Sequence, residues 1–177
     1  MKGPMMRSNR KVLVLDTSVL CCWLEVPGKQ TAGSRDDPWT TERIATLIKT
    51  ETAKGSVLVL PIASLIETGN HIAQAQSRRH ECAVELAMHI ASTADAASPW
   101  AAFTEQSTLW EPEKLKAMAR EWPDLAKGGL SIGDATIKQV AEHYARAGFR
   151  VEILTGDAGL KAYEPTHPPL QPRRRGG

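Results

Sequence analysis

Short apolar runs alternate along this chain with longer segments in which apolar residues recur every three to four positions. The runs, rich in Val and Leu, lie at residues 12–15, 57–60 and 151–154. Such runs are typical of strands buried on both faces in a parallel sheet. Helical spacing predicts a helix or turn over 19–24 and helices over 41–53, from Pro61 onward, over 78–91, over 111–122 and over 131–147. Alternating strands and helices predict an α/β fold with a mainly parallel sheet.

Two segments carry less regular patterns. Residues 27–38 are rich in Gly, Pro, Ser and Asp and are predicted to form a loop. Residues 92–110 show no clear period, and we expect a weakly marked strand or irregular structure near Trp100 to Trp110. With 177 residues the chain is long enough for one full core. We divide it into a basic extension at 1–10, one domain at 11–163 and a Pro- and Arg-rich tail at 164–177.

Composition narrows the class of protein. A hydrophobic fraction of 42% and a charged fraction of 24% are ordinary for globular domains. No apolar run is long enough to span a membrane, and no apolar core follows the basic start, so we expect neither a membrane span nor a signal peptide. Three cysteines, two of them adjacent, fit neither a disulfide framework nor a zinc-ligand spacing. We therefore expect reduced thiols in a cytoplasmic protein.

The net charge of +2 is too small to indicate nucleic-acid binding by itself. Basic residues are concentrated at both ends of the chain, where they can contact phosphate or simply keep the ends soluble. Among the five tryptophans, Trp39 in the predicted loop is the best candidate for stacking on a base, while core packing is expected of most others.

Four acidic residues are predicted to meet at one edge of the sheet. Asp16 directly follows the first apolar run, and Asp157 lies three residues beyond the last one. Glu67 and Asp134 lie in early helical turns, after a strand and after a Gly-rich break respectively. Sites in open parallel sheets form beyond the carboxyl ends of the strands. The order and placement of the four acids therefore indicate one shared site.

Each acid also has a structural explanation. Asp16 can accept hydrogen bonds from the turn that it begins, and Asp157 can cap a short helix. Asp134 stands in S-x-x-D spacing from a serine at a helix start, where a carboxylate also suits the helix dipole. Glu67 has the same spacing from Ser64, but Ser64 is expected inside the helix, which weakens a capping role. The set of four is therefore more informative than any member.

Four clustered carboxylates need a counter-charge. Two unit charges about 4 Å apart repel by about 1 kcal/mol even in water. A hard divalent cation relieves this repulsion, and ligands that are all oxygen favour Mg²⁺ or Mn²⁺ over zinc. Such a cation lowers the pKa of a bound water for phosphodiester hydrolysis, and a second can steady the leaving oxygen. Ser18 and Thr155 are expected to hydrogen-bond a carboxylate, a metal-bound water or a phosphate, with local turn bonding equally open.

Four segments, in order, resemble the motifs of the PIN-domain nucleases, which include the toxin ribonucleases of bacterial toxin–antitoxin pairs. They are VLVLDTSVL, LPIASLIETGNHI, LSIGDATIKQVAEHY and VEILTGDAGL, and the resemblance covers about residues 11–163. It implies a three-layer α/β/α Rossmann-like fold with a mainly parallel five-stranded sheet in the order 3-2-1-4-5. It also implies Mg²⁺- or Mn²⁺-dependent cleavage of RNA, with Asp16, Glu67, Asp134 and Asp157 as ligands. Homodimers and an antitoxin that covers the site are the partners it implies.

The chain departs from this pattern in ways that bear on the toxin role more than on the nuclease assignment. Extra length lies in residues 27–40 and mostly in 92–129, where the family's third strand is poorly marked, and the basic tail has no counterpart. A non-catalytic PIN-like module that binds RNA or protein is the main alternative. A phosphotransfer enzyme is less favoured, because Asp16 lacks a second Asp two residues on. His71, four residues after Glu67, is expected to be a surface or hydrogen-bonded residue and not a zinc ligand.

Overall fold

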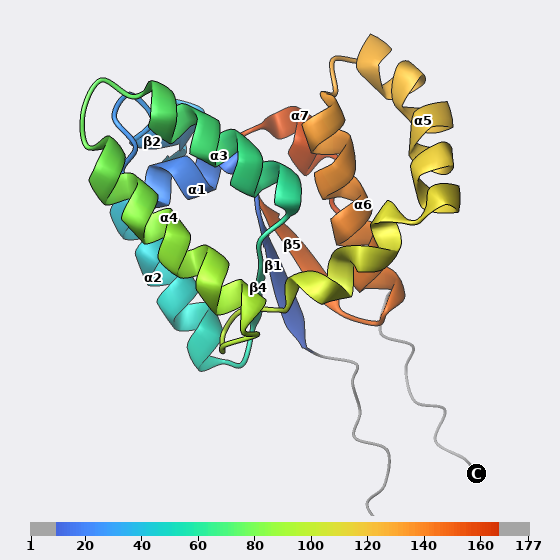
Figure 1. Cartoon of the computed structure of the whole chain (residues 1–177), viewed down its shortest axis with the longest axis horizontal. Helices are drawn as coiled ribbons and strands as arrows, with labels where there is room; N and C mark the ends of the chain where they lie inside the picture. Colours follow the sequence, from blue (N-terminus) through green and yellow to red (C-terminus); the bar gives the residue numbers. More distant parts are fainter. Residues whose placement is uncertain (1–9, 167–177) are drawn as a thin grey trace, which may run out of the picture.

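The computed structural model describes residues 10–166, and its centre is a parallel sheet of three strands (Figure 1). The strands are β1 (Lys11–Leu15), β4 (Val57–Val59) and β5 (Arg150–Leu154), in the order β4-β1-β5. Val12 pairs with Val57 on one side and with Val151 on the other. The three predicted strands are thus confirmed, and their carboxyl ends share one edge.

Helices cover both faces of this sheet, which explains why its strands are apolar throughout. Leu13 and Leu15 pack into one buried cluster, whereas Val12 and Val14 pack into another on the opposite face. The first cluster is completed by α1 (Thr17–Trp23), α2 (Thr41–Ala53), α3 (Ile62–Gln74) and α4 (Arg79–Ala94). The second is completed by α6 (Ile132–Arg146) and α7 (Ala158–Lys161). The protein is therefore an α/β fold, as predicted.

Side-chain oxygens fix where four of the helices begin. Asp16 caps α1, Thr40 caps α2, Ser131 caps α6 and Asp157 caps α7, each accepting a hydrogen bond from a backbone N–H in the first turn. Pro61 stands immediately before α3. These caps place the acid-bearing starts of α1, α6 and α7 directly beyond strands or breaks, where the sequence pattern predicted them.

The segment 27–38, predicted to be a loop, forms most of a short hairpin that ends at Thr40. Strand β2 (Thr31–Gly33) pairs antiparallel with β3 (Pro38–Thr40). Strands of three residues are too short to show an alternating pattern, and their pairing depends on the neighbouring strand and not on local sequence. The hairpin lies close to the β5–α7 turn: a Cβ atom added at Gly156 would lie only 2.5 Å from Gly33 N.

The segment 92–110 contains a single strand-like residue followed by a helix. Trp100 forms an isolated parallel bridge with Leu58 on the outer side of β4. A 3-10 helix, η1 (Phe103–Trp110), follows, and its buried Gln106 donates to Leu60 O. The longer helix α5 (Pro112–Lys127) then packs beside α6 (Figure 1).

Within residues 10–166, no helix combines the length and the apolar character needed to cross a membrane. Most of the basic extension at 1–10 and of the Pro- and Arg-rich tail at 164–177 lies outside the described residues.

Candidate functional site

All four predicted acids line one cavity of about 750 Å³. They come from separate elements: Asp16 from the β1–α1 junction, Glu67 from α3, Asp134 from the first turn of α6 and Asp157 from the β5–α7 turn. Figure 1 shows α1, α3, α6 and α7 gathered around one end of the sheet. The acids are far apart in sequence and share this site because parallel strands end at the same edge.

Asp16 is the most deeply placed of the four, with 5% of its surface exposed. Its Oδ2 accepts hydrogen bonds of 2.7 Å from the hydroxyls of both Ser18 and Thr155. Each hydroxyl also accepts a backbone bond of 2.9 Å, from Gly156 N to Ser18 and from Asp157 N to Thr155. The predicted carboxylate contacts of Ser18 and Thr155 are therefore confirmed, and turn bonding occurs at the same two hydroxyls.

Glu67 is held between α1 and α6. The Thr17 hydroxyl donates to Glu67 Oε2 at 2.9 Å. The other oxygen lies against Gly133, where an added Cβ atom would overlap it. Ser64 is fully buried inside α3 and donates to Leu15 O at 2.7 Å, so it does not cap the helix. The capping explanation for Glu67 therefore fails, as the sequence reasoning anticipated.

Asp134 and Asp157 both take part in helix starts, but in different ways. Asp134 uses its backbone N–H, which donates to Ser131 Oγ at 3.0 Å. The exposed Asp157 uses its side chain, with Oδ1 accepting from Gly159 N at 2.7 Å. Burial, followed by the charges of Asp16 and Asp157, raises the pKa of Asp134 above its ordinary value, against an opposing effect of hydrogen bonds with Ser131. Asp16 and Asp157 are thus close enough to Asp134 to affect its ionisation.

Three of the carboxylates share a pattern of bonding. One oxygen of each is bound by a protein donor, while the other accepts no hydrogen bond within residues 10–166: Asp16 Oδ1, Glu67 Oε1 and Asp157 Oδ2. Oxygen donors of this kind suit Mg²⁺ or Mn²⁺. However, no three His, Cys, Asp or Glu side chains of the described residues form a compact metal-binding group. Mutual repulsion between like charges favours such a spread arrangement.

Residues in and beside the cavity that the sequence reasoning did not identify also shape the candidate site. Thr17 and Gly133 hold and accommodate Glu67, and Lys29 adds a cation to the lining. His71, expected to be a surface or hydrogen-bonded residue, is partly exposed and also lines the cavity. The only sequence signal for a role of Thr17 in the site was its place between Asp16 and Ser18, directly after a strand. Lys29 gave no such signal, because it lies in the segment predicted to be a loop.

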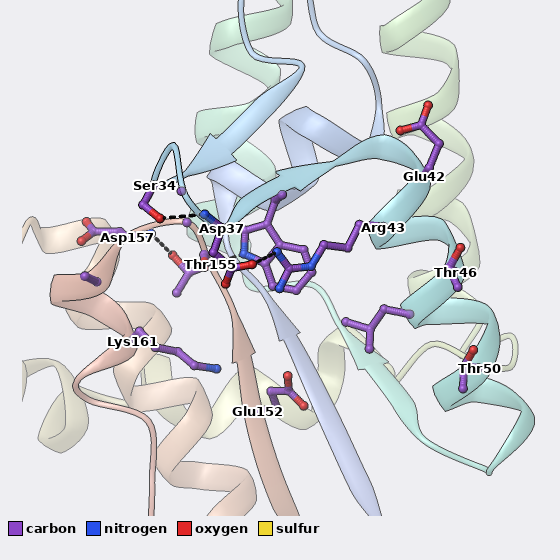
Figure 2. Close-up of a pocket in the computed structure, with 15 residues that line it drawn as sticks. Ser34, Asp37, Glu42, Arg43, Thr46, Thr50, Glu152, Thr155, Asp157 and Lys161 are labelled. Carbon is purple, nitrogen blue, oxygen red and sulfur yellow. Dashed lines mark hydrogen bonds and ion pairs between the residues drawn. The ribbon is translucent and has the colours of Figure 1, made fainter.

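A second cavity, of about 870 Å³, adjoins the first (Figure 2). The two share Gly33 and the segment 156–158, so Asp157 faces both. The larger cavity is otherwise lined by the hairpin, by α2 and by α7, including Trp39, Arg43 and Lys161. No family model matches the chain, and comparison with curated proteins and with solved structures gives no match.

Proposed function

We propose that the protein is a metal-dependent ribonuclease of the PIN type. One observation carries the proposal: four acids from four separate segments line one cavity at the carboxyl edge of a parallel sheet. Asp16, Glu67, Asp134 and Asp157 are the residues that would hold Mg²⁺ or Mn²⁺. The chemistry that such a cation supplies is activation of water for attack on a phosphodiester.

The electrostatic cost of placing four acids in one cavity supports a ligand-binding role for them over a purely structural one. Burial, and then the charges of Asp16 and Asp157, raise the pKa of Asp134, so placing this carboxyl group in the cavity opposes its ionisation. A capped turn needs only one acceptor oxygen, and Asn or Ser would supply it without the charge. An ionised cluster is explained when a cation of opposite charge is the ligand.

The chain's own residues prepare the acids for this role. Ser18 and Thr155 fix one oxygen of Asp16, and Thr17 fixes one oxygen of Glu67. Fixing one oxygen restricts the carboxylate and directs the other toward a ligand. Because no three acids of the described residues form a compact group, cation binding would require movement of side chains other than the fixed ones of Asp16 and Glu67.

The strand order also supports the proposed family. Trp100, β4, β1 and β5 lie side by side in that order, and they correspond to the first four positions of the pattern 3-2-1-4-5. We propose that the chain is a variant of the five-stranded PIN sheet in which the third strand is reduced to the bridge at Trp100. An antitoxin partner, a homodimer and a toxin role remain predictions of the same resemblance, and a cytoplasmic location remains a prediction from the cysteines.

The proposal is tested by incubating the protein with end-labelled single-stranded RNA and Mn²⁺, with and without a chelator. We expect cleavage that requires the metal and that Asp16→Asn abolishes. Asp124→Asn is the matched control, because Asp124 is an exposed aspartate on α5, outside the lining of the cavity. Cleavage in chelator, or full activity of Asp16→Asn, would refute the mechanism. RNA binding with no cleavage under any metal condition would support the non-catalytic alternative instead.

A further inference from the structure

The larger cavity beside the acids contains two planar side chains stacked on each other (Figure 2). The Arg43 guanidinium lies 4.1 Å from the centroid of the Trp39 ring. Arg43 Nη1 donates to Asp37 Oδ1 at 2.7 Å and to Pro38 O at 3.0 Å, which holds the guanidinium in place. The Arg43 side chain is nevertheless 41% exposed, so a further planar group can approach it.

This stack is tied directly to the acid cavity. Trp39 Nε1 donates to Thr155 O at 3.0 Å, and the Thr155 hydroxyl donates to Asp16. Gly156, the next residue, lies so close to the hairpin that a side chain there would meet Gly33. The position of the stack relative to the acids is therefore set by the β5–α7 turn, which borders both cavities.

The charges of the larger cavity do not suit a phosphate. Its lining holds four carboxylates and only two cations, and both cations are already paired with acids. They are Asp37, Glu42, Glu152 and Asp157 against Arg43 and Lys161. Carboxylates repel phosphate, but they accept hydrogen bonds from the amino groups of bases. Its volume of about 870 Å³ is ample for one nucleoside, since small-molecule pockets measure roughly 300–1,000 Å³.

We propose that this cavity receives an unstacked base of single-stranded RNA, which stacks on the outer face of Arg43. Stacking on aromatic rings and on Arg guanidinium planes is a common way for proteins to hold splayed bases. Asp157 lines both cavities, so the backbone of the same strand would pass over the acid cavity, where the cation of the proposed nuclease would offset the repulsion between the acids and phosphate. The inference rests on the proposed nuclease function for the substrate class, and it selects single strands, since a base in a duplex is not free to enter.

Binding measured in Ca²⁺, with the RNA shown to stay intact on a gel, tests the base site separately from cleavage, because a hard cation bound by carboxylates offsets their repulsion of phosphate. The probes are a fluorescein-labelled, mixed-sequence RNA of ten nucleotides and the same strand annealed to its complement, followed by anisotropy at low salt. Arg43→Ala and Arg43→Lys should both bind the single strand about tenfold more weakly than the unaltered protein, because each removes the planar face. Lysine keeps the charge, so wild-type affinity in Arg43→Lys would overturn the proposal.

Two comparisons complete the experiment. Arg120→Ala removes one exposed cation from α5, outside the cavity lining, and should leave the affinity within about twofold of the unaltered protein. Equal binding of duplex and single strand, or no binding of the single strand at all, would also overturn the proposal. The unfolding temperature of each variant identifies any that fails to fold, and Trp39→Phe then provides an independent change to the same stack.

Cleavage assays with Mn²⁺ separate this proposal from the nuclease itself. We expect Arg43→Lys to raise KM about tenfold. Cleavage with an unchanged KM in Arg43→Lys would refute the base site and leave the nuclease proposal standing. Arg43-dependent binding of single strands without any cleavage would refute the nuclease proposal and leave the base site standing.

Discussion

Two substitutions of Asp16 should separate its structural role from its proposed role as a ligand. Asp16→Ala removes the oxygen to which Ser18 and Thr155 both donate at 2.7 Å, whereas Asp16→Asn retains one carbonyl oxygen. Thr155 is 7% exposed, so its hydroxyl has little access to water once its acceptor is gone. We expect Asp16→Ala to lose both stability and activity, and Asp16→Asn to lose chiefly activity.

The bonds around Asp16 give the size of the effect. A hydrogen bond to a charged acceptor contributes roughly 1.5–3 kcal/mol, and half-buried Ser18 recovers part of its loss from water, so Asp16→Ala should cost about 2–4 kcal/mol. For a domain of this size, 3 kcal/mol corresponds to a fall in Tm of about 6–12 °C. Asn keeps both hydroxyl bonds as weaker, neutral ones, so its cost should be about 1 kcal/mol. Asp16→Asn also removes the repulsion between Asp16 and Asp134, which offsets part of this loss of stability.

Urea denaturation in chelator, followed by tryptophan fluorescence, measures these free energies of unfolding. The same two proteins are then assayed for RNA cleavage with Mn²⁺. Wild-type stability in Asp16→Ala would show that the hydroxyl network contributes nothing to folding. A loss in Asp16→Asn as large as that in Asp16→Ala would mean that the charge itself, and not the acceptor oxygen, holds the turn.

Three further predictions concern the same edge of the sheet. In chelator at pH 7, Asp134→Asn should raise Tm, because the pKa of Asp134 is raised in the folded state. The stability that protonated Asp134 contributes to the fold is fully present below the ordinary pKa of 3.8, and it is lost as the pH rises through the folded-state pKa. The gain should therefore disappear below pH 3.8, and a lower Tm at pH 7 would contradict this reasoning. Gly156→Ala places a Cβ atom 2.5 Å from Gly33 N and should cost about 1–3 kcal/mol in urea denaturation, whereas unchanged stability would mean that the hairpin moves freely. Mn²⁺ at a hundred times its Kd should stabilise the protein by about 2.7 kcal/mol, and an equal shift in Asp16→Asn would exclude Asp16 as a ligand.

Much of the fold was predictable because its strongest patterns are local. The runs at 12–15, 57–60 and 151–154 became β1, β4 and β5, since a strand covered by helices on both faces needs apolar side chains at every position. The caps at Ser131 and Asp157 were equally predictable, because capping depends on residues within one turn.

The buried face of α3 was not predictable in this way. Apolar side chains are generally expected to be buried, yet Ile66 is 54% exposed while Ser64 and Thr68 are completely buried. Ser64 is buried because Leu15 O offers it a partner from β1. Hydropathy alone treats a serine as polar, and only the fold shows that its hydrogen bond is satisfied.

The sequence by itself determined the α/β class, the order of the acids and their places after strands or in early helical turns, because these depend on local periodicity and chain order. Tertiary structure alone decided which oxygen of Asp16, Glu67 and Asp157 is held and which accepts no hydrogen bond from the described part of the chain. It also decided that Trp39 and Arg43 stack beside Asp157. Those features depend on contacts such as Thr155 with Asp16, separated by 139 residues, and Trp39 with Thr155, separated by 116. No local pattern encodes such contacts, because they exist only once parallel strands align at a common edge.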